Sequence, residues 1–297
     1  MPRRAWSRVR IQITPRWLLR LLTRPITLTI VVAVLLGASA GQIFAKSGDG
    51  TRVVVGNTGG TLSSVIQLND TLIVFGGGNA RTDLADLVGR STLPWRRHID
   101  LLIVPGWDDQ QALGALGLLE RGDVAQIVLL GQPSTATVWS VFYQSASSHA
   151  VPVTVATGMN RVAIGPNIDL QLIAAAPSSG ASDEYALMTL HFHDVNFSFL
   201  DASKAGMSAM SAANVQPERT HGIALSRPVA GLSTKSVLLM RPPANRAADI
   251  SDEAVTYSGE IGAGQHVAIR LSDDSLSLNL ISVQLNGPGS PVPNPTN

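Results

Sequence analysis

The sequence predicts a mixed α/β or α+β fold in which two sheets form the core and helices lie outside them. The chain has 297 residues, of which 45% are hydrophobic, so it can bury a large core. Its first half alternates short apolar runs with turn-forming residues in the order β-β-β-α-β-α-β-α-β. The second half continues as further strands, and such an order is typical of sheets covered by helices.

The first half is expected to begin with three strands and then to alternate helices with strands. Apolar runs of four to six residues between turn residues indicate the strands, and an Asn69-Asp70 turn joins the second to the third. Leu84, Leu87 and Val88 recur at helical spacing. The expected strands are 52–55, 62–67, 71–74, 99–104, 126–130 and 151–156, and the expected helices are 82–90, 110–121 and 136–147.

The second half is rich in strands and ends in a tail that we expect to be disordered. Residues 286–297 consist largely of proline, asparagine and glycine, a composition that cannot bury enough apolar surface to fold. The expected strands are 161–164, 170–174, 187–191, 196–200, 238–240, 267–271 and 276–283.

The N-terminal part of the chain predicts a membrane segment. Residues 1–25 carry seven arginines and no acid, and residues 26–45 contain no charge and are long enough to cross a bilayer. The arginines favour a cytoplasmic N-terminus, with the remainder outside the cell membrane after a linker at 46–51. We expect a single-pass signal anchor. The alternatives are a signal peptide cleaved near Ala38-Ser39-Ala40 and a buried soluble helix.

Charge and cysteine content exclude several kinds of site. After the leader the chain has 22 − 7 = 15 basic residues against 21 acids, a net charge of −6. Such a body is a poor generic ligand for phosphate backbones, so a nucleic-acid partner is not expected, although it is not excluded. The chain contains no cysteine, which excludes disulfides, thiolate zinc sites and a cysteine nucleophile.

The order of motifs between residues 52 and 285 resembles metallo-β-lactamase-fold proteins, in particular the competence-protein (ComEC-type) subgroup. VVVGNTGGTLSSVIQLNDTLIVFGGG is similar to that subgroup's opening strands and glycine turn. Phe75 stands where the family has an aspartate, and Ile99–Val104 is similar to the strand that precedes its metal motif. The resemblance implies a domain over 52–285 that forms a four-layer αββα sandwich.

The family's metal motif is degenerate in this chain. That motif reads His-x-His-x-Asp-His, because three imidazoles and a carboxylate must converge on two metal ions about 4 Å apart. Pro105, Trp107 and Gln110 occupy the three histidine positions, and Asp109 alone keeps a ligand type. Proline and tryptophan cannot coordinate zinc, and glutamine offers only a neutral oxygen. We therefore expect no two-metal centre of the family's kind, and no cofactor.

More distant residues are candidates for a rearranged metal site. The resemblance places either Asp201 or Ser203 at the family's metal-bridging aspartate, and it makes His221 a candidate for a later ligand. His221 is otherwise a loop histidine. His191 and His193 are two apart on a predicted strand, so they would share one face and could chelate a metal. The alternative is an ordinary solvated strand face.

Three features near the motif have a structural and a functional interpretation. Asp108 and Asp109 could hold a single metal, or they could cap the helix that follows. Trp107 could fill the vacated metal cavity, or it could be exposed for a partner. Gly76–Gly78 is interpreted as the family's turn, because it lacks the spacing of a phosphate-binding loop.

These observations lead to two hypotheses of different class. The first is a membrane-anchored, extracytoplasmic, non-catalytic binding or scaffold protein whose protein partner is unknown. The second is a residual metal-dependent hydrolase, a phosphoesterase or nuclease that uses zinc or manganese in a rearranged site. That site would draw on Asp109, Asp201, His221, His191 and His193.

Overall fold

The computed structural model describes residues 51–93, 98–174, 184–202, 208, 220–226, 236–243, 255–271 and 281–282. The predictions for the basic segment, the membrane segment and the tail lie outside these ranges. None of the helices within them has both the length and the apolar character needed to cross a bilayer. The predicted mixed α/β class with a two-sheet core is confirmed, because the described strands form one sheet of eight strands and one of seven.

The first sheet is antiparallel on one side of β3 and parallel on the other. β1, β2 and β3 pair antiparallel, and β3, β5, β7 and β8 pair parallel, as expected for strands joined through helices. The strands, in spatial order, are β17 (Ile281–Ser282), β16 (His266–Leu271), β1 (Thr51–Asn57), β2 (Leu62–Leu68), β3 (Thr71–Phe75), β5 (Leu101–Pro105), β7 (Ile127–Leu130) and β8 (Val153–Ala156).

The second sheet has the same mixed character. β9 to β12 pair antiparallel, and β12 to β15 pair parallel. The strands, in spatial order, are β15 (Val255–Glu260), β14 (Ser236–Arg241), β13 (Thr220–Leu225), β12 (Val195–Ala202), β11 (Tyr185–Phe192), β10 (Ile168–Ala174) and β9 (Gly158–Gly165). A separate pair joins β4 (His98–Ile99) to β6 (Asp123–Val124).

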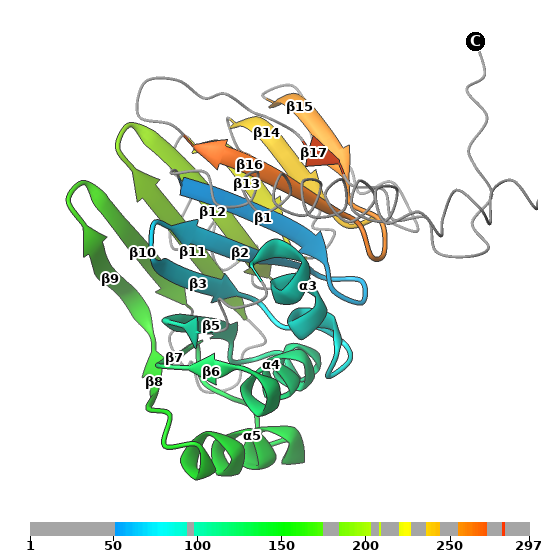
Figure 1. Ribbon diagram of the computed structural model, residues 1–297, viewed down its shortest axis with the longest axis vertical. Helices are drawn as coiled ribbons and strands as arrows, with labels where there is room; N and C mark the ends of the chain where they lie inside the picture. The colour runs from blue at the N-terminus through cyan, green and yellow to red at the C-terminus, as the bar shows by residue number, and fades with distance from the viewer. Residues whose placement is uncertain are drawn as a thin grey trace, which may run out of the picture. The chain divides into compact units, whose positions relative to one another are not determined.

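Apolar side chains of the two sheets interdigitate to form the main core. Phe75 of β3 and Phe199 of β12 meet there, with ring centroids 5.8 Å apart. The helices α3 (Asp83–Ser91), α4 (Asp109–Arg121) and α5 (Thr137–Ser148) cover the outer face of the first sheet and build a second core with it (Figure 1). The bounds of each of these helices agree with the predicted start and end to within one residue.

The outer face of the second sheet carries a third apolar cluster. Its members alternate along their strands with residues of the main core, so they point away from the first sheet. They are Ile173, Tyr185, Leu187, Leu200, Ala202, Ile223, Leu225 and Leu239. Among the described residues, three of the four layers implied by the αββα resemblance are present: the helices and both sheets. The described residues include no helical layer on the outer face of the second sheet, so the fourth layer stays a prediction.

Two strands of the second sheet have no counterpart in the sequence-based expectations. β13 was expected to be a loop around His221 and Gly222, yet it is a central strand between β12 and β14. Gly222 fits a strand because the ring of Phe197 lies where its side chain would be. β15 was missed as well. Only β17 of the strand expected over 276–283 falls within the described ranges.

Candidate functional site

The candidate site lies where the carboxyl ends of β3, β5 and β12 approach the start of α4. The loop after β3, Gly76–Gly78, is pressed against this helix. A side chain at Gly77 would overlap the backbone of Gln111, and one at Gly114 would overlap the backbone of Gly78. These glycines therefore permit two backbones to touch, which agrees with the interpretation of the triple glycine as a turn.

Buried hydroxyl groups hold the other side of this loop. Ser63 of β2 donates a hydrogen bond to the carbonyl of Gly77 at 3.0 Å, and its hydroxyl lies 2.7 Å from that of Thr58. Both side chains are buried. Gly76 has a φ of +106°, and a Cβ there would lie 2.6 Å from the Ser63 hydroxyl. The loop is thus fixed between β2 and α4.

The central feature of the site is a buried carboxyl group paired with a buried amide. Asp201 is the penultimate residue of β12, and Gln111 lies in the first turn of α4; both are 0% exposed. The Gln111 Nε2 group donates a short hydrogen bond to Asp201 Oδ2. Burial raises the pKa of Asp201 from 3.8 to about 8, although the hydrogen bond from Gln111 opposes this effect. Burial therefore favours the protonated form of this carboxyl group near neutral pH.

The other polar atom of the amide has no matching donor. Gln111 Oε1 is buried and has no hydrogen-bond partner among the described residues. A protonated carboxyl group is a donor as well as an acceptor, whereas a carboxylate is an acceptor only. A neutral Asp201 therefore suits this amide better than an ionised one does. Of the two candidates for the bridging position, Asp201 lies at the site, and Ser203 falls outside the described ranges.

The three predicted histidine positions have separate environments. Pro105 is the last residue of β5 and is buried, and it pairs with Leu130 of β7. Trp107 lies in the turn that follows, is half-buried and sits beside Gly131. Gln110 is exposed in the first turn of α4. Part of the Trp107 ring is therefore buried and part faces solvent, so the ring does not simply fill an interior cavity.

Asp108 and Asp109 have different roles. Asp108 is the N-cap of α4, and its Oδ1 accepts a hydrogen bond from the backbone N–H of Gln110 at 3.0 Å, so the capping prediction is confirmed for this residue. Asp109 does not cap the helix. Its Oδ1 accepts hydrogen bonds from Trp139 Nε1 at 2.9 Å and from the Ser134 hydroxyl at 2.6 Å. The ligand-type residue of the motif thus connects α4 to α5.

The prediction that His191 and His193 share a strand face is wrong. β11 ends at Phe192, and His193 begins the turn to β12 with a φ of +52°. Its ring instead stacks edge-on against Phe192, with centroids 4.8 Å apart. The alternation of strand side chains stops where this turn begins, so the spacing of two carries no information there.

His191 and His221 lie near one another, but on the face opposite Asp201. His191 Nδ1 is 2.9 Å from Asn196 Oδ1, and the backbone N–H of Asn196 donates to His221 Nδ1 at 3.1 Å. His221 alternates with Gly222 on β13 and lies on the side of the third apolar cluster. Asp201 alternates with Leu200 of that cluster and points inward. The second sheet therefore separates the two histidines from the buried carboxyl group.

The described residues that were candidates for metal ligands do not converge on one point. Within the described ranges, no three His, Asp or Glu side chains come together in an arrangement that could hold a metal ion. Asp201 has a raised pKa and faces an amide, Asp109 accepts a hydrogen bond from α5, and His191 and His221 lie on another face. A metal site needs deprotonated donors that converge on one point. Sequence reasoning placed Asp201 near the site but missed Gln111, whose role no local motif signals.

No family model and no curated protein matches the chain. The metallo-β-lactamase fold protein YhfI from Bacillus subtilis is similar, with a TM-score of 0.49 and 9% identity, over 75% of this chain and 100% of that one. Zinc-bound PqqB from Methylobacterium extorquens gives 0.43 and 9%, over 71% and 89%. The Rm3 metallo-β-lactamase gives 0.42 and 13%, over 59% and 75%. Likeness at this level does not transfer their chemistry to this chain.

Proposed function

We propose that the chain is a metallo-β-lactamase-like protein without the family's two-metal centre, and that it is a binding or scaffold protein rather than a hydrolase. The observation that carries the proposal is the buried pair of Asp201 and Gln111. A bridging carboxylate must be ionised and must face the metal ions. Here the candidate carboxyl group is fully buried, has a pKa raised to about 8, and is bonded to an amide.

The remaining candidates support the same proposal. Asp109 accepts hydrogen bonds from Ser134 and Trp139, so one of its oxygens is committed to the α4–α5 contact. His191 and His221 are bonded to Asn196 on the outer face of the second sheet. A metal-bound hydroxide, the nucleophile of this hydrolase chemistry, needs a cluster of deprotonated donors, and the described residues form no such cluster.

The setting that we propose is the outer face of a cell membrane, with residues 26–45 as a single-pass anchor. The seven arginines before this apolar run and the net charge of −6 after it are consistent with that orientation. The acidic body also favours a protein partner over a nucleic acid. Cross-linking in intact membranes would identify that partner.

The test is the metal content and hydrolytic activity of the full chain. The protein is purified with zinc and, separately, with manganese, dialysed, and analysed by elemental mass spectrometry. Hydrolysis of bis(p-nitrophenyl) phosphate is then measured on the same samples. We expect much less than one metal ion per chain and no turnover above a protein-free control.

The competing hypothesis, a residual metal-dependent hydrolase, makes the opposite prediction. It requires at least one tightly held metal ion per chain and phosphodiesterase activity that depends on it. If both were observed, and both were lost in Asp201→Asn, a rearranged catalytic site would exist and the proposed binding role would be refuted. Asp194→Asn, in the exposed turn before β12, is the matched control and should change neither quantity.

A further inference from the structure

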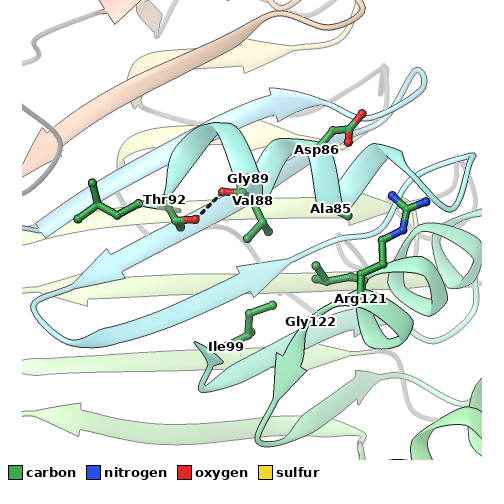
Figure 2. A pocket seen from close by; sticks show the side chains of 10 residues that line it. Ala85, Asp86, Val88, Gly89, Thr92, Ile99, Arg121 and Gly122 are labelled. Atoms are coloured by element: carbon green, nitrogen blue, oxygen red, sulfur yellow. Dashed lines mark hydrogen bonds between the residues drawn. The ribbon is translucent and has the colours of Figure 1, made fainter. Parts of the chain in front are cut away.

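A pocket unrelated to the Asp201 site lies between the C-terminal halves of α3 and α4, beside β4 (Figure 2). Its volume is about 320 Å³, within the lower range of small-molecule pockets, roughly 300–1,000 Å³. Val88, Leu93, Ile99 and Leu118 supply apolar walls. The hydroxyl of Thr92, which also lines the pocket, already donates to the carbonyl of Val88 at 2.8 Å. The walls therefore favour contact with an apolar group.

A glycine keeps the mouth of this pocket open. Gly89 lies inside α3, is exposed, and lines the pocket, and a Cβ at this position would meet nothing within 4 Å. Glycine is the least favourable residue in a helix interior after proline. Packing does not account for it here, in contrast to Gly114 and Gly117 of α4, whose missing side chains let the chain approach closely. Because Gly89 has no side chain, the mouth of the pocket stays open.

Among the described residues that line the pocket, Arg121 is the only cation. Arg121, the last residue of α4, is exposed and makes no hydrogen bond or ion pair with any described residue. Figure 2 shows its guanidinium group at one end of the lining, whereas the carboxylate of Asp86 points away from the pocket. A guanidinium group binds carboxylates and phosphates with paired donors. The charge at the rim therefore complements an anion.

We propose that this pocket binds a small amphipathic anion, with a short apolar chain between α3 and α4 and its carboxylate at Arg121. Hexanoate is a suitable probe, because it combines a short apolar chain with one carboxylate for Arg121 and does not form micelles at low concentration. An anion of this size with one exposed charge partner should bind with a dissociation constant on the order of 1 mM.

The test is binding of hexanoate to the full chain, measured by saturation-transfer NMR with variants in the same detergent. Gly89→Leu should abolish binding because the side chain fills the mouth, and Arg121→Gln should weaken it about tenfold. Gly89→Ala and Arg90→Gln, on the same helix, should stay within about twofold of the wild type, as expected for surface changes. Both Gly89 variants improve helix propensity, so their thermal midpoints should not fall, and loss of binding in Gly89→Leu is then not unfolding.

Two further probes separate the apolar contact from the charge. 1-Hexanol should bind more weakly than hexanoate, should be insensitive to Arg121→Gln, and should be excluded by Gly89→Leu. Binding of hexanoate that survives Gly89→Leu would overturn the site. Suppose that hexanoate binding is lost in Gly89→Leu, but that its dissociation constant is the same in Arg121→Gln as in Arg90→Gln. That result would overturn the preference for anions. No saturable binding in the wild type would overturn the proposal as a whole.

Discussion

Asp201 and Gln111 are 90 positions apart in the chain, and their side chains meet in the interior. Burial disfavours the charged form of a carboxyl group, so it raises the pKa of Asp201 and favours the protonated acid. The Gln111 amide then donates its hydrogen bond to a neutral acid. The proposed absence of a two-metal centre rests most directly on this residue pair.

Stability should depend on pH through Asp201. Its pKa is about 8 in the folded protein and near 3.8 when unfolded, so the folded state binds the proton more tightly. Its contribution to stability is therefore complete below about pH 4 and is lost as pH rises towards 8. Asp201→Asn cannot ionise. The free energy of unfolding of this variant, relative to the wild type, should rise by about 1.4 kcal/mol per pH unit across that window.

Urea unfolding at several pH values measures this difference. Asp194→Asn, which removes an exposed carboxylate in the turn before β12, is the control and should run parallel to the wild type. Parallel curves for Asp201→Asn and the wild type between pH 4 and 8 would mean that Asp201 is ionised in the folded protein and that the neutral acid–amide pair does not form.

Asp109 should matter for stability and not for metal binding. Its Oδ1 accepts the indole N–H of Trp139, a side chain that is 2% exposed. Asp109→Ala leaves this buried donor without its partner, which costs about 1–3 kcal/mol of unfolding free energy. Ser134→Ala removes the exposed second donor to Asp109 and the hydroxyl that accepts from the backbone N–H of Ala136, and it should cost less because both bonds are exposed. The opposite result would make Asp109 a metal ligand: a wild-type protein that contains metal, and an Asp109→Ala variant that loses the metal but keeps the same denaturation midpoint.

At the scale of elements, the contact between α4 and the loop after β3 defines the site. Gly114 and Gly117 lie on the face of α4 that touches Gly78 and Arg81, and a side chain at either position would overlap their backbone atoms. The helix can therefore approach the loop only because these positions lack a Cβ. Gly89 on α3 is the opposite case, because its missing side chain faces open space.

This contrast gives a paired prediction for alanine substitutions. Gly114→Ala should destabilise the protein by several kcal/mol, roughly the cost of forced overpacking and more than the gain in helix propensity. Gly89→Ala should stabilise it by about 0.5–1 kcal/mol, because only the propensity changes. Thermal unfolding of both variants beside the wild type decides the matter. Equal midpoints for the two variants would show that α4 and the loop after β3 are not in close backbone contact.

Local patterns predicted most elements because most strands and helices here have strong apolar periodicity. They failed at β13, where Gly222 is accommodated by the ring of Phe197 from a neighbouring strand, a contact that no local pattern contains. They failed again at His193, because the turn that ends β11 has no glycine or proline to mark it. At β13 the determining contact is distant in sequence, and at His193 the turn depends on a residue with a left-handed backbone conformation.

At the scale of the whole molecule, the second sheet decides which candidate residues can cooperate. Asp201 points into the core, whereas His191 and His221 lie on the outer face. Asp201 also lies at the opposite end of these strands, because it pairs with Ala186 at the start of β11. The sequence predicted the strand that carries His191 and the strand that ends beside Asp201, but it missed β13, which carries His221. It could not assign their faces, because a shift of one residue in a strand moves a side chain to the other side. The sequence also could not reveal that Gln111 pairs with Asp201, because the two residues lie 90 positions apart and on different elements.

The membrane segment leads to a prediction for the whole chain. With residues 26–45 as an uncleaved anchor, the protein should remain in the membrane pellet after carbonate extraction. Its N-terminal residue should then be Met1, or Pro2 if the initiating methionine is removed. N-terminal sequencing of the extracted protein checks this. A mature N-terminus near Gly41, with release into the soluble fraction, would instead indicate a cleaved signal peptide.

The most direct measurement of the central claim is the protonation state of Asp201 in the presence of zinc. Infrared difference spectroscopy of the full chain against Asp201→Asn isolates the carbonyl band of this one carboxyl group. We predict a protonated-acid band that persists through neutral pH, fades near pH 8, and does not change when zinc is added. An ionised carboxylate at pH 6 to 7 that shifts on addition of zinc would contradict the claim, because Asp201 would then be a metal ligand.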